Sequence, residues 1–215
     1  TPVAGEIAPP HLALAEPLSC CLRATKRLPI ESDSRVLVLG TGPIGLIHCG
    51  LAASAGARVM ACGRQARLDP ARAMGAELTT SAQGEDLVHE VLAWTDGVGA
   101  DVVIIAVGAP GLVPIAAQCA RIGGQVSFFA GFPAGAMADI DPNLVHYREL
   151  TISGSANATL DDYAAAVDAL SSGRIDLSPL ITHEYELSNV SDALDAVRTR
   201  AGLKVAVRPR GIAAL

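Results

Sequence analysis

Residues 36–45 read Val-Leu-Val-Leu-Gly-Thr-Gly-Pro-Ile-Gly, an apolar run that passes directly into three glycines with the spacing GxGxxG. The spacing alone is a weak signal, but here it follows a strand pattern and precedes a helix pattern. In that context Gly40 permits a tight turn, Gly42 lets backbone amides approach a pyrophosphate, and Gly45 allows the helix to pack closely on the strand. The stretch therefore predicts a strand–turn–helix unit that binds the phosphates of a dinucleotide.

The N-terminus of the predicted helix strengthens this phosphate site. It offers unpaired N–H groups and a partial positive charge to an anion. The residues expected to contact the pyrophosphate are Gly40, Gly42, Pro43, Ile44 and Gly45. A glycine-rich turn that binds no ligand remains the alternative.

Outward from this stretch the chain alternates between strand and helix patterns. Strands are predicted at 35–39, 58–62, 77–79, 101–107, 125–130 and 150–153, and helices at 44–55, 70–74, 85–94 and 112–120. The strands lack polar alternation, which is typical of parallel strands covered on both faces. Six such strands predict an α/β protein with a doubly wound, six-stranded parallel sheet, the Rossmann fold.

The composition excludes several functional classes. The chain has a net charge of −6 without a run of like charges, so a nucleic acid is not an expected partner. Its apolar stretches are strand-sized and too short to cross a membrane. Five cysteines without CxxC spacing argue against a disulfide framework and a structural zinc site. A soluble protein of the reducing cytoplasm is expected.

The end of the second predicted strand bears on the choice between NAD and NADP. An acidic residue there binds the adenosine ribose hydroxyls and would repel a 2′-phosphate. Here the chain continues with Cys62, Gly63 and Arg64, and Arg67 follows shortly after. Arginine pairs with phosphate through charge-assisted hydrogen bonds. NADP is therefore the expected cofactor and NAD is possible, while a merely solvated Arg64 is the alternative.

Contacts to the nicotinamide are predicted where the fourth and fifth strands end, because ligands bind outside the carboxyl ends of parallel strands. The residues concerned are Val107 and Gly108 after the fourth strand, and Ala130 and Gly131 after the fifth. Residues 155–157, which follow the sixth strand, are a weaker candidate. Simple turn geometry would also account for these glycines.

Several separated stretches carry a resemblance to a known family. They are AEPLS at 15–19, the stretch 36–45, AGA at 55–57, MGA at 74–76, GGQ at 123–125 and SGRID at 172–176. Together they resemble the medium-chain zinc-dependent dehydrogenases, in particular the sorbitol and threonine dehydrogenase branch. The likeness extends over essentially the whole chain.

The resemblance implies a zinc-assisted NAD(P)-dependent oxidoreductase that interconverts an alcohol or polyol and its carbonyl. In that branch the glutamate of the EPLS phrase lies at the catalytic zinc, which would be Glu16 here, although Glu16 could instead favour the start of a helix. The remaining zinc ligands of the family lie in an N-terminal catalytic domain that this sequence lacks. Zinc is therefore expected only if that domain is supplied, and the catalytic residues stay unknown.

The same resemblance suggests the domain organisation. Residues 1–30 are expected to be a lead-in and remnant of the second, mostly absent catalytic domain, with 1–10 extended. Residues 31–173 would form the dinucleotide-binding domain, in which 132–147 is irregular and 160–171 helical. Residues 174–215 would return toward the catalytic domain through a helix and a closing strand, 205–207, whose partner is expected to be missing.

The sequence is also compatible with two other functions. A zinc-free reductase of the quinone or enoyl type would also bind NADPH, although Glu16 in its EPLS phrase argues against it. A nucleotide-binding module without catalysis is the third reading. The expected partners are a small alcohol or carbonyl substrate and, from the family, further copies of the chain in a homo-oligomer.

Overall fold

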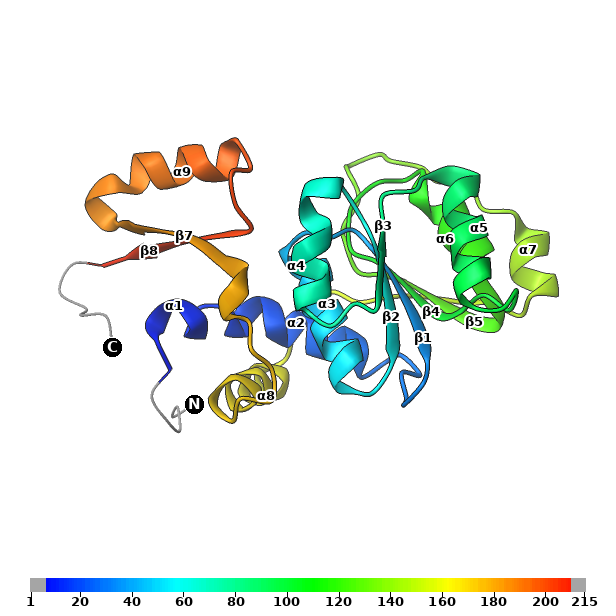
Figure 1. The fold of residues 1–215 in the computed structure, drawn as a ribbon, viewed down its shortest axis with the longest axis horizontal. Coiled ribbons are helices and arrows are strands. Elements are labelled where there is room, and N and C mark those ends of the chain that lie inside the picture. Colours follow the sequence, from blue (N-terminus) through cyan, green and yellow to red (C-terminus); the bar gives the residue numbers. More distant parts are fainter. Residues whose placement is uncertain (1–6, 210–215) are drawn as a thin grey trace. The chain divides into compact units, whose positions relative to one another are not determined.

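The computed structural model describes residues 7–209, which divide into two compact units. Residues 21–157 form the sheet unit, and the described residues 7–20 and 158–209 form the terminal unit (Figure 1). The boundary falls within helix α2, Ala15–Thr25. No helix in the described range is long and apolar enough to cross a membrane.

A single six-stranded sheet with the order β3-β2-β1-β4-β5-β6 organises the sheet unit, and all its neighbouring strands are parallel. The strands are β1 Arg35–Leu39, β2 Arg58–Cys62, β3 Leu78–Thr80, β4 Ala100–Ile105, β5 Ala120–Phe128 and β6 Thr151–Gly154. The order reverses at β1, because Leu39 at its end pairs with Cys62 of β2 on one side and Ile105 of β4 on the other. The predicted doubly wound Rossmann sheet is thereby confirmed.

Helices cover both faces of this sheet. They are α3 Pro43–Ser54, α4 Leu68–Ala73, α5 Gly84–Trp94, α6 Leu112–Cys119 and α7 Pro142–Tyr147, with a short 3₁₀ turn, Gln65–Arg67, before α4. In Figure 1, α3 and α4 lie on one face and α5, α6 and α7 on the other. Leu37 and Leu39 of β1 pack in one buried cluster with Leu87 of α5 and Val113 of α6. Burial on both faces explains the unbroken apolar strand patterns.

Two strands differ from their predicted bounds by more than one residue at an end. β4 ends at Ile105, so Val107 lies in the following turn, where its carbonyl accepts a hydrogen bond from the N–H of Ala109. β5 begins at Ala120, well before the predicted start, and continues through Gly123 and Gly124. A Cβ at Gly124 would lie 2.9 Å from the carbonyl oxygen of Arg121. Glycine is needed there for a close backbone approach within an irregular strand.

Two short helices were not predicted. The stretch 132–147, expected to be irregular, contains α7, which starts at Pro142 and is capped by the Asp141 side chain accepting the Asn143 N–H. The lead-in was expected to be extended to residue 10, but α1, Pro9–Leu12, begins inside it. Residues 1–6 lie outside the described residues. Both helices are too short to show a 3.6-residue period, and each starts at a proline, which suits the first helical position.

The terminal unit contains a second, smaller sheet. Its elements are α1, α8 Leu160–Ser171, the 3₁₀ turn Ser178–Leu180, β7 Ile181–Glu186, the 3₁₀ turn Leu187–Asn189, α9 Val190–Arg198 and β8 Lys204–Arg208. β8 pairs with β7 in parallel, so the expectation that the closing strand lacks its partner was wrong. α8, which we had expected within the dinucleotide-binding domain, groups with this unit.

Candidate functional site

The loop between β1 and α3 has the geometry that a phosphate-binding turn requires. Gly40 has φ of +109°, a conformation that residues with a Cβ rarely adopt. Its N–H donates to the carbonyl oxygen of Cys62 at 2.8 Å, which ties the loop to the end of β2. A Cβ at Gly40 would also lie 3.0 Å from the Cβ of Val107, so the loop passes close to the end of β4.

Gly45 and Gly42 serve different purposes in the same loop. A Cβ at Gly45 would lie 1.7 Å from the carbonyl oxygen of Gly40, so no other residue fits this position. A Cβ at Gly42 would meet no atom within 4 Å, so the chain's own packing does not demand glycine there. Gly42 is the N-cap of α3 and provides no side-chain cap, which leaves N–H groups of the first turn available to an anion. Space next to Gly42 is what a bound pyrophosphate would need.

The turn after β2 presents two arginines and no carboxylate. Arg64 is exposed and precedes the 3₁₀ turn, whereas Arg67 at the end of that turn is half-buried. Burial and, secondarily, the neighbouring Arg64 guanidinium lower the pKa of Arg67 from its ordinary value. Two positive charges held close together, on the edge where β1 also ends, favour an anion between or beside them.

The loops after β4 and β5 meet each other at the same edge of the sheet. A Cβ at Gly108 would lie 2.3 Å from the carbonyl oxygen of Gly131, so these loops are in close backbone contact. The N–H of Ala130 donates to the carbonyl oxygen of Ile105 at 3.0 Å. The structure thus gathers Gly40, Val107, Gly108 and Gly131 on one edge, and their contacts to a cofactor remain a prediction.

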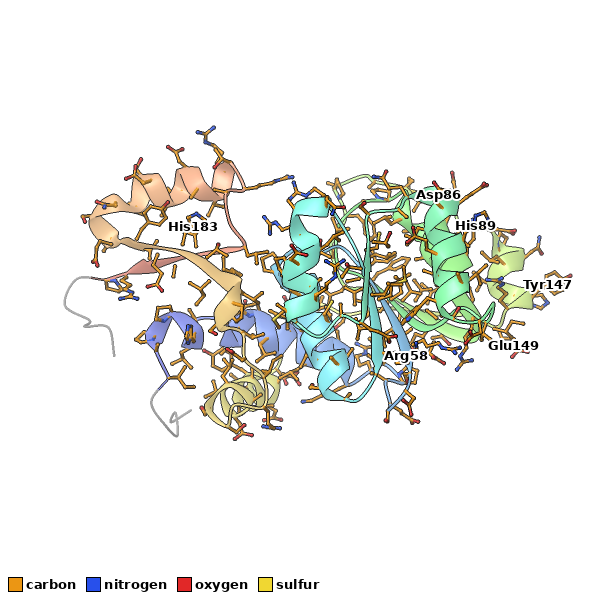
Figure 2. The ribbon with its side chains drawn as sticks, viewed as in Figure 1. Arg58, Asp86, His89, Tyr147, Glu149 and His183 are labelled. Atoms are coloured by element: carbon orange, nitrogen blue, oxygen red, sulfur yellow. The ribbon has the colours of Figure 1, made fainter. Side chains whose placement is uncertain are left out.

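A histidine behind this edge was not singled out by the sequence. His48 of α3 is 1% exposed, and its ring meets that of Phe129 edge-on, next to Ala130. Neither ring nitrogen has a hydrogen-bond partner in the described structure, and burial lowers the pKa of His48 to about 4. His48 is therefore a neutral packing group near neutral pH. His89, by contrast, is exposed on α5 (Figure 2).

Another buried polar atom lies just beyond β6. The hydroxyl oxygen of Ser155 is buried without a partner in the described structure. The N–H of Ser155 donates to the carbonyl oxygen of Phe128 at 3.3 Å, which holds the residue at the carboxyl edge of the sheet. Its position agrees with that of the weaker candidate stretch, 155–157.

The predicted zinc contact lies in the terminal unit. Glu16 is exposed in the first turn of α2, and the Cys20 thiol donates to its carboxylate at 3.7 Å. Burial, followed by the Glu16 carboxylate, raises the pKa of the Cys20 thiol. Across residues 7–209, no three His, Cys, Asp or Glu side chains come together as a metal site requires. The described residues do not by themselves fit a catalytic zinc ion, and the role of Glu16 stays a prediction.

Comparison with known proteins shows the family to which the chain belongs. The family model described as zinc-binding dehydrogenase matches residues 43–172, from the start of α3 to the end of α8. The chain belongs to the zinc-binding dehydrogenase family. The resemblance stated from the EPLS and GTGPIG phrases is thereby confirmed.

Two curated relatives of the chain are named as a polyol-phosphate dehydrogenase and a polyol dehydrogenase. It is 33% identical over 208 residues to D-arabitol-phosphate dehydrogenase from Enterococcus avium, which covers 93% of this chain and 59% of the relative. It is 31% identical to sorbitol dehydrogenase from Halalkalibacterium halodurans, covering 92% of this chain and 58% of the relative. The chain thus spans less than two thirds of these relatives.

Solved structures agree with the fold. An alcohol dehydrogenase from Thermus sp. ATN1 superposes with a TM-score of 0.89 at 25% identity, covering 97% of this chain and 60% of that one. A zinc-binding dehydrogenase from Sinorhizobium meliloti 1021 bound to NADP has a TM-score of 0.76 at 29% identity, covering 85% of this chain and 54% of that one.

Proposed function

We propose that the sheet unit binds NADP in preference to NAD, and that the chain is the cofactor-binding part of an oxidoreductase that interconverts an alcohol or polyol and its carbonyl. The observation that carries the proposal is the loop between β1 and α3. Gly40 has φ of +109°, Gly45 is locked against the Gly40 carbonyl, and space remains beside Gly42. A loop built in this way at the reversal of strand order fits a pyrophosphate.

Each part of the edge would hold one part of the cofactor. The first turn of α3 and the Gly42 backbone would donate N–H groups to the pyrophosphate. Arg64 would pair with the 2′-phosphate of the adenosine ribose. Val107, Gly108, Ala130 and Gly131 would line the nicotinamide, where the touching backbones of Gly108 and Gly131 leave a side-chain-free surface. The bound nicotinamide supplies hydride acceptance, while the chain's residues orient the ring against the substrate.

The preference for NADP rests on charge. The turn after β2 holds Arg64 and Arg67 and no carboxylate. The two guanidinium groups would attract a 2′-phosphate, and the turn has no negative side chain that would repel it. The NADP-bound relative from Sinorhizobium meliloti supports the same cofactor class.

The substrate class and the zinc ion belong to the proposal for the protein as a whole. The named relatives act on a polyol phosphate and on sorbitol, which supports an alcohol or polyol substrate. A zinc ion would need ligands beyond the described residues, because these do not group as a metal site. A homo-oligomer and a cytoplasmic location are further parts of the proposal that rest on the family likeness and composition alone.

The first test is a titration of the purified chain with NADPH and NADH, followed by nicotinamide fluorescence. NADPH should bind more tightly, and Arg64→Ala should weaken NADPH at least about tenfold while NADH changes little, because a charged hydrogen bond is lost. Arg72→Ala is the matched control, since Arg72 is an exposed arginine of the same unit paired only with Asp69 in the ion pairs of the described structure. Failure of wild-type chain to bind either nucleotide would overturn the proposal.

A second measurement, made on protein that includes an N-terminal catalytic half, separates the reaction classes. Zinc-dependent oxidation of a polyol supports the proposed dehydrogenase. Metal-independent reduction of a quinone or enoyl substrate would point to the zinc-free reductase instead. Tight cofactor binding without turnover of either kind would leave a nucleotide-binding module.

A further inference from the structure

Gly63, directly after β2, is a glycine for reasons of space and not of backbone conformation. Its φ is not positive, so a residue with a Cβ could adopt the same backbone conformation. A Cβ placed on it, however, would lie 1.9 Å from Oγ1 of Thr41, 2.7 Å from its Cγ2 and 2.8 Å from its Cβ. Thr41 therefore occupies the volume that a side chain at position 63 would need.

Neither residue of this pair can easily move away. Thr41 is only 4% exposed and lies between Gly40 and Gly42 of the phosphate loop. The Gly40 N–H donates to the Cys62 carbonyl at 2.8 Å, and the Gly63 N–H donates to the Thr80 carbonyl at 2.9 Å. Rotation of Thr41 about χ1 would not relieve the contact, because its Cβ is itself too close. β-branched side chains are also stiff at χ1.

Gly63 lies at the end of the second strand, in the region where a Rossmann domain recognises the ribose. In a Rossmann domain, the acid that binds the ribose hydroxyls follows the second strand, and a carboxylate there repels a 2′-phosphate. Gly63 is the first residue after β2, which ends at Cys62. A carboxylate at this position would have to extend from the Cβ that Thr41 excludes.

We propose that Thr41 determines the cofactor preference of this chain by excluding a side chain, and thus a carboxylate, from position 63. The turn then meets the ribose with the Gly63 backbone and the Arg64 and Arg67 guanidinium groups, without a carboxylate at position 63, which selects a 2′-phosphorylated dinucleotide. Thr41 acts through Gly63 and is a positioning residue of the site. This inference rests on the proposed function, because it specifies how the same nucleotide site discriminates.

The test is a double-mutant cycle of Gly63→Asp and Thr41→Gly in the full chain, with NADPH and NADH affinities and melting temperature measured for each variant. Gly63→Asp alone should lower the melting temperature and weaken both nucleotides at least about tenfold, because the new side chain pushes the phosphate loop out of place. The double variant should regain melting temperature and shift the ratio of NADH to NADPH affinity at least about tenfold toward NADH. Thr41→Ser is the matched control, since serine keeps the Cβ and should not rescue Gly63→Asp.

Two results would overturn the inference without touching the proposed function. One is a Gly63→Asp chain that melts like wild type and already prefers NADH. The other is a cycle in which the two substitutions act additively on melting temperature and affinity, since independent sites show no coupling. If the wild-type chain binds neither nucleotide, the proposed function and this inference are both wrong.

Discussion

The ring of His48 meets the ring of Phe129 edge-on, with centroids 4.6 Å apart and planes inclined at 78°. The contact joins the helix that follows the phosphate loop to the residue that precedes Ala130, so it supports two parts of the candidate site from behind. Burial without a hydrogen-bond partner in the described structure keeps the imidazole neutral and lowers the pKa of His48 to about 4.

The first prediction is that His48 makes the fold sensitive to acid. Its folded pKa of about 4 lies below the ordinary value of 6.5, so the unfolded chain binds more protons between these values. The stabilisation from keeping His48 neutral is fully present above pH 6.5, decreases as the pH falls and is lost near pH 4. The loss should reach about 3 kcal/mol of unfolding free energy. Urea unfolding of wild type and His48→Leu between pH 4 and 8 measures this pH dependence of the unfolding free energy.

The leucine variant should show a flatter pH profile and, at pH 8, a stability equal to or above that of wild type, because two unpaired buried nitrogens are removed. His89→Gln, which changes an exposed histidine of α5, controls for histidine loss in general. Identical pH profiles for wild type and His48→Leu would contradict the prediction.

The second prediction separates folding from binding within one loop. Gly45→Ala places a methyl group 1.7 Å from the Gly40 carbonyl oxygen and should destabilise the fold by about 2 kcal/mol or more. Gly42→Ala meets nothing within 4 Å and should change stability by less than about 0.5 kcal/mol. If the pyrophosphate lies beside Gly42, that variant should still weaken NADPH at least about tenfold. Chemical denaturation and fluorescence titration of both variants decide this, and tight NADPH binding by Gly42→Ala would speak against the placement.

Much of the sheet unit could be predicted because its signals are local. Residues 36–45 carry a strand, a turn and a helix start in ten consecutive positions, and β2 and β4 contain unbroken apolar runs at 59–62 and 102–105. β7 gave a weaker signal. Its half-buried residues Ile181, His183 and Tyr185 alternate with exposed polar ones, but two of these three side chains are themselves partly polar. Such a strand is easily read as a loop.

The parts of the site that could not be predicted depend on contacts between distant residues. The exclusion of a side chain at Gly63 by Thr41 appears only when β1 and β2 lie side by side. The burial of His48 likewise depends on Phe129, which follows β5. Composition and the spacing of apolar residues indicate which face of a helix or strand is buried, but they do not indicate which residue from another element packs against that face.

The third prediction concerns the edge of the sheet opposite the candidate site. The Asp101 carboxylate accepts the backbone N–H of Arg35 at 2.7 Å and the Nε of Arg121 at 2.5 Å. Burial alone would raise the pKa of Asp101, but these two partners lower it below its ordinary value. Its stabilisation is therefore present above the unfolded pKa of about 3.9 and is lost as the pH falls through the folded value.

Asp101→Asn should reduce the unfolding free energy by about 1–2 kcal/mol at pH 7, and the difference from wild type should shrink below pH 4. Asp96→Asn is the control, because Asp96 pairs with Arg35 but its side chain is 80% exposed, so less than about 0.5 kcal/mol is expected. Equal losses for the two variants would show that the Asp101 contacts are no stronger than a surface ion pair.

The fourth prediction concerns Arg148, which follows α7 and reaches back to the end of α6. Its guanidinium donates to the carbonyl oxygens of Gln118 at 2.9 Å and Ala120 at 3.1 Å, and so satisfies acceptors that a helix end leaves unpaired. Arg148→Ala should lower the unfolding free energy by about 1–2 kcal/mol, and Arg148→Lys by less, because an ammonium keeps a positive charge and N–H donors near the helix C-terminus but not the position from which Nη1 reaches both carbonyls. Urea unfolding measures whether the unfolding free energy falls in the order wild type, Arg148→Lys, Arg148→Ala. Arg72→Ala is the control for the loss of an exposed arginine. Should alanine and lysine at position 148 both match wild type, the last turn of α6 does not depend on this side chain, and α7 is held to α6 by its apolar contacts alone.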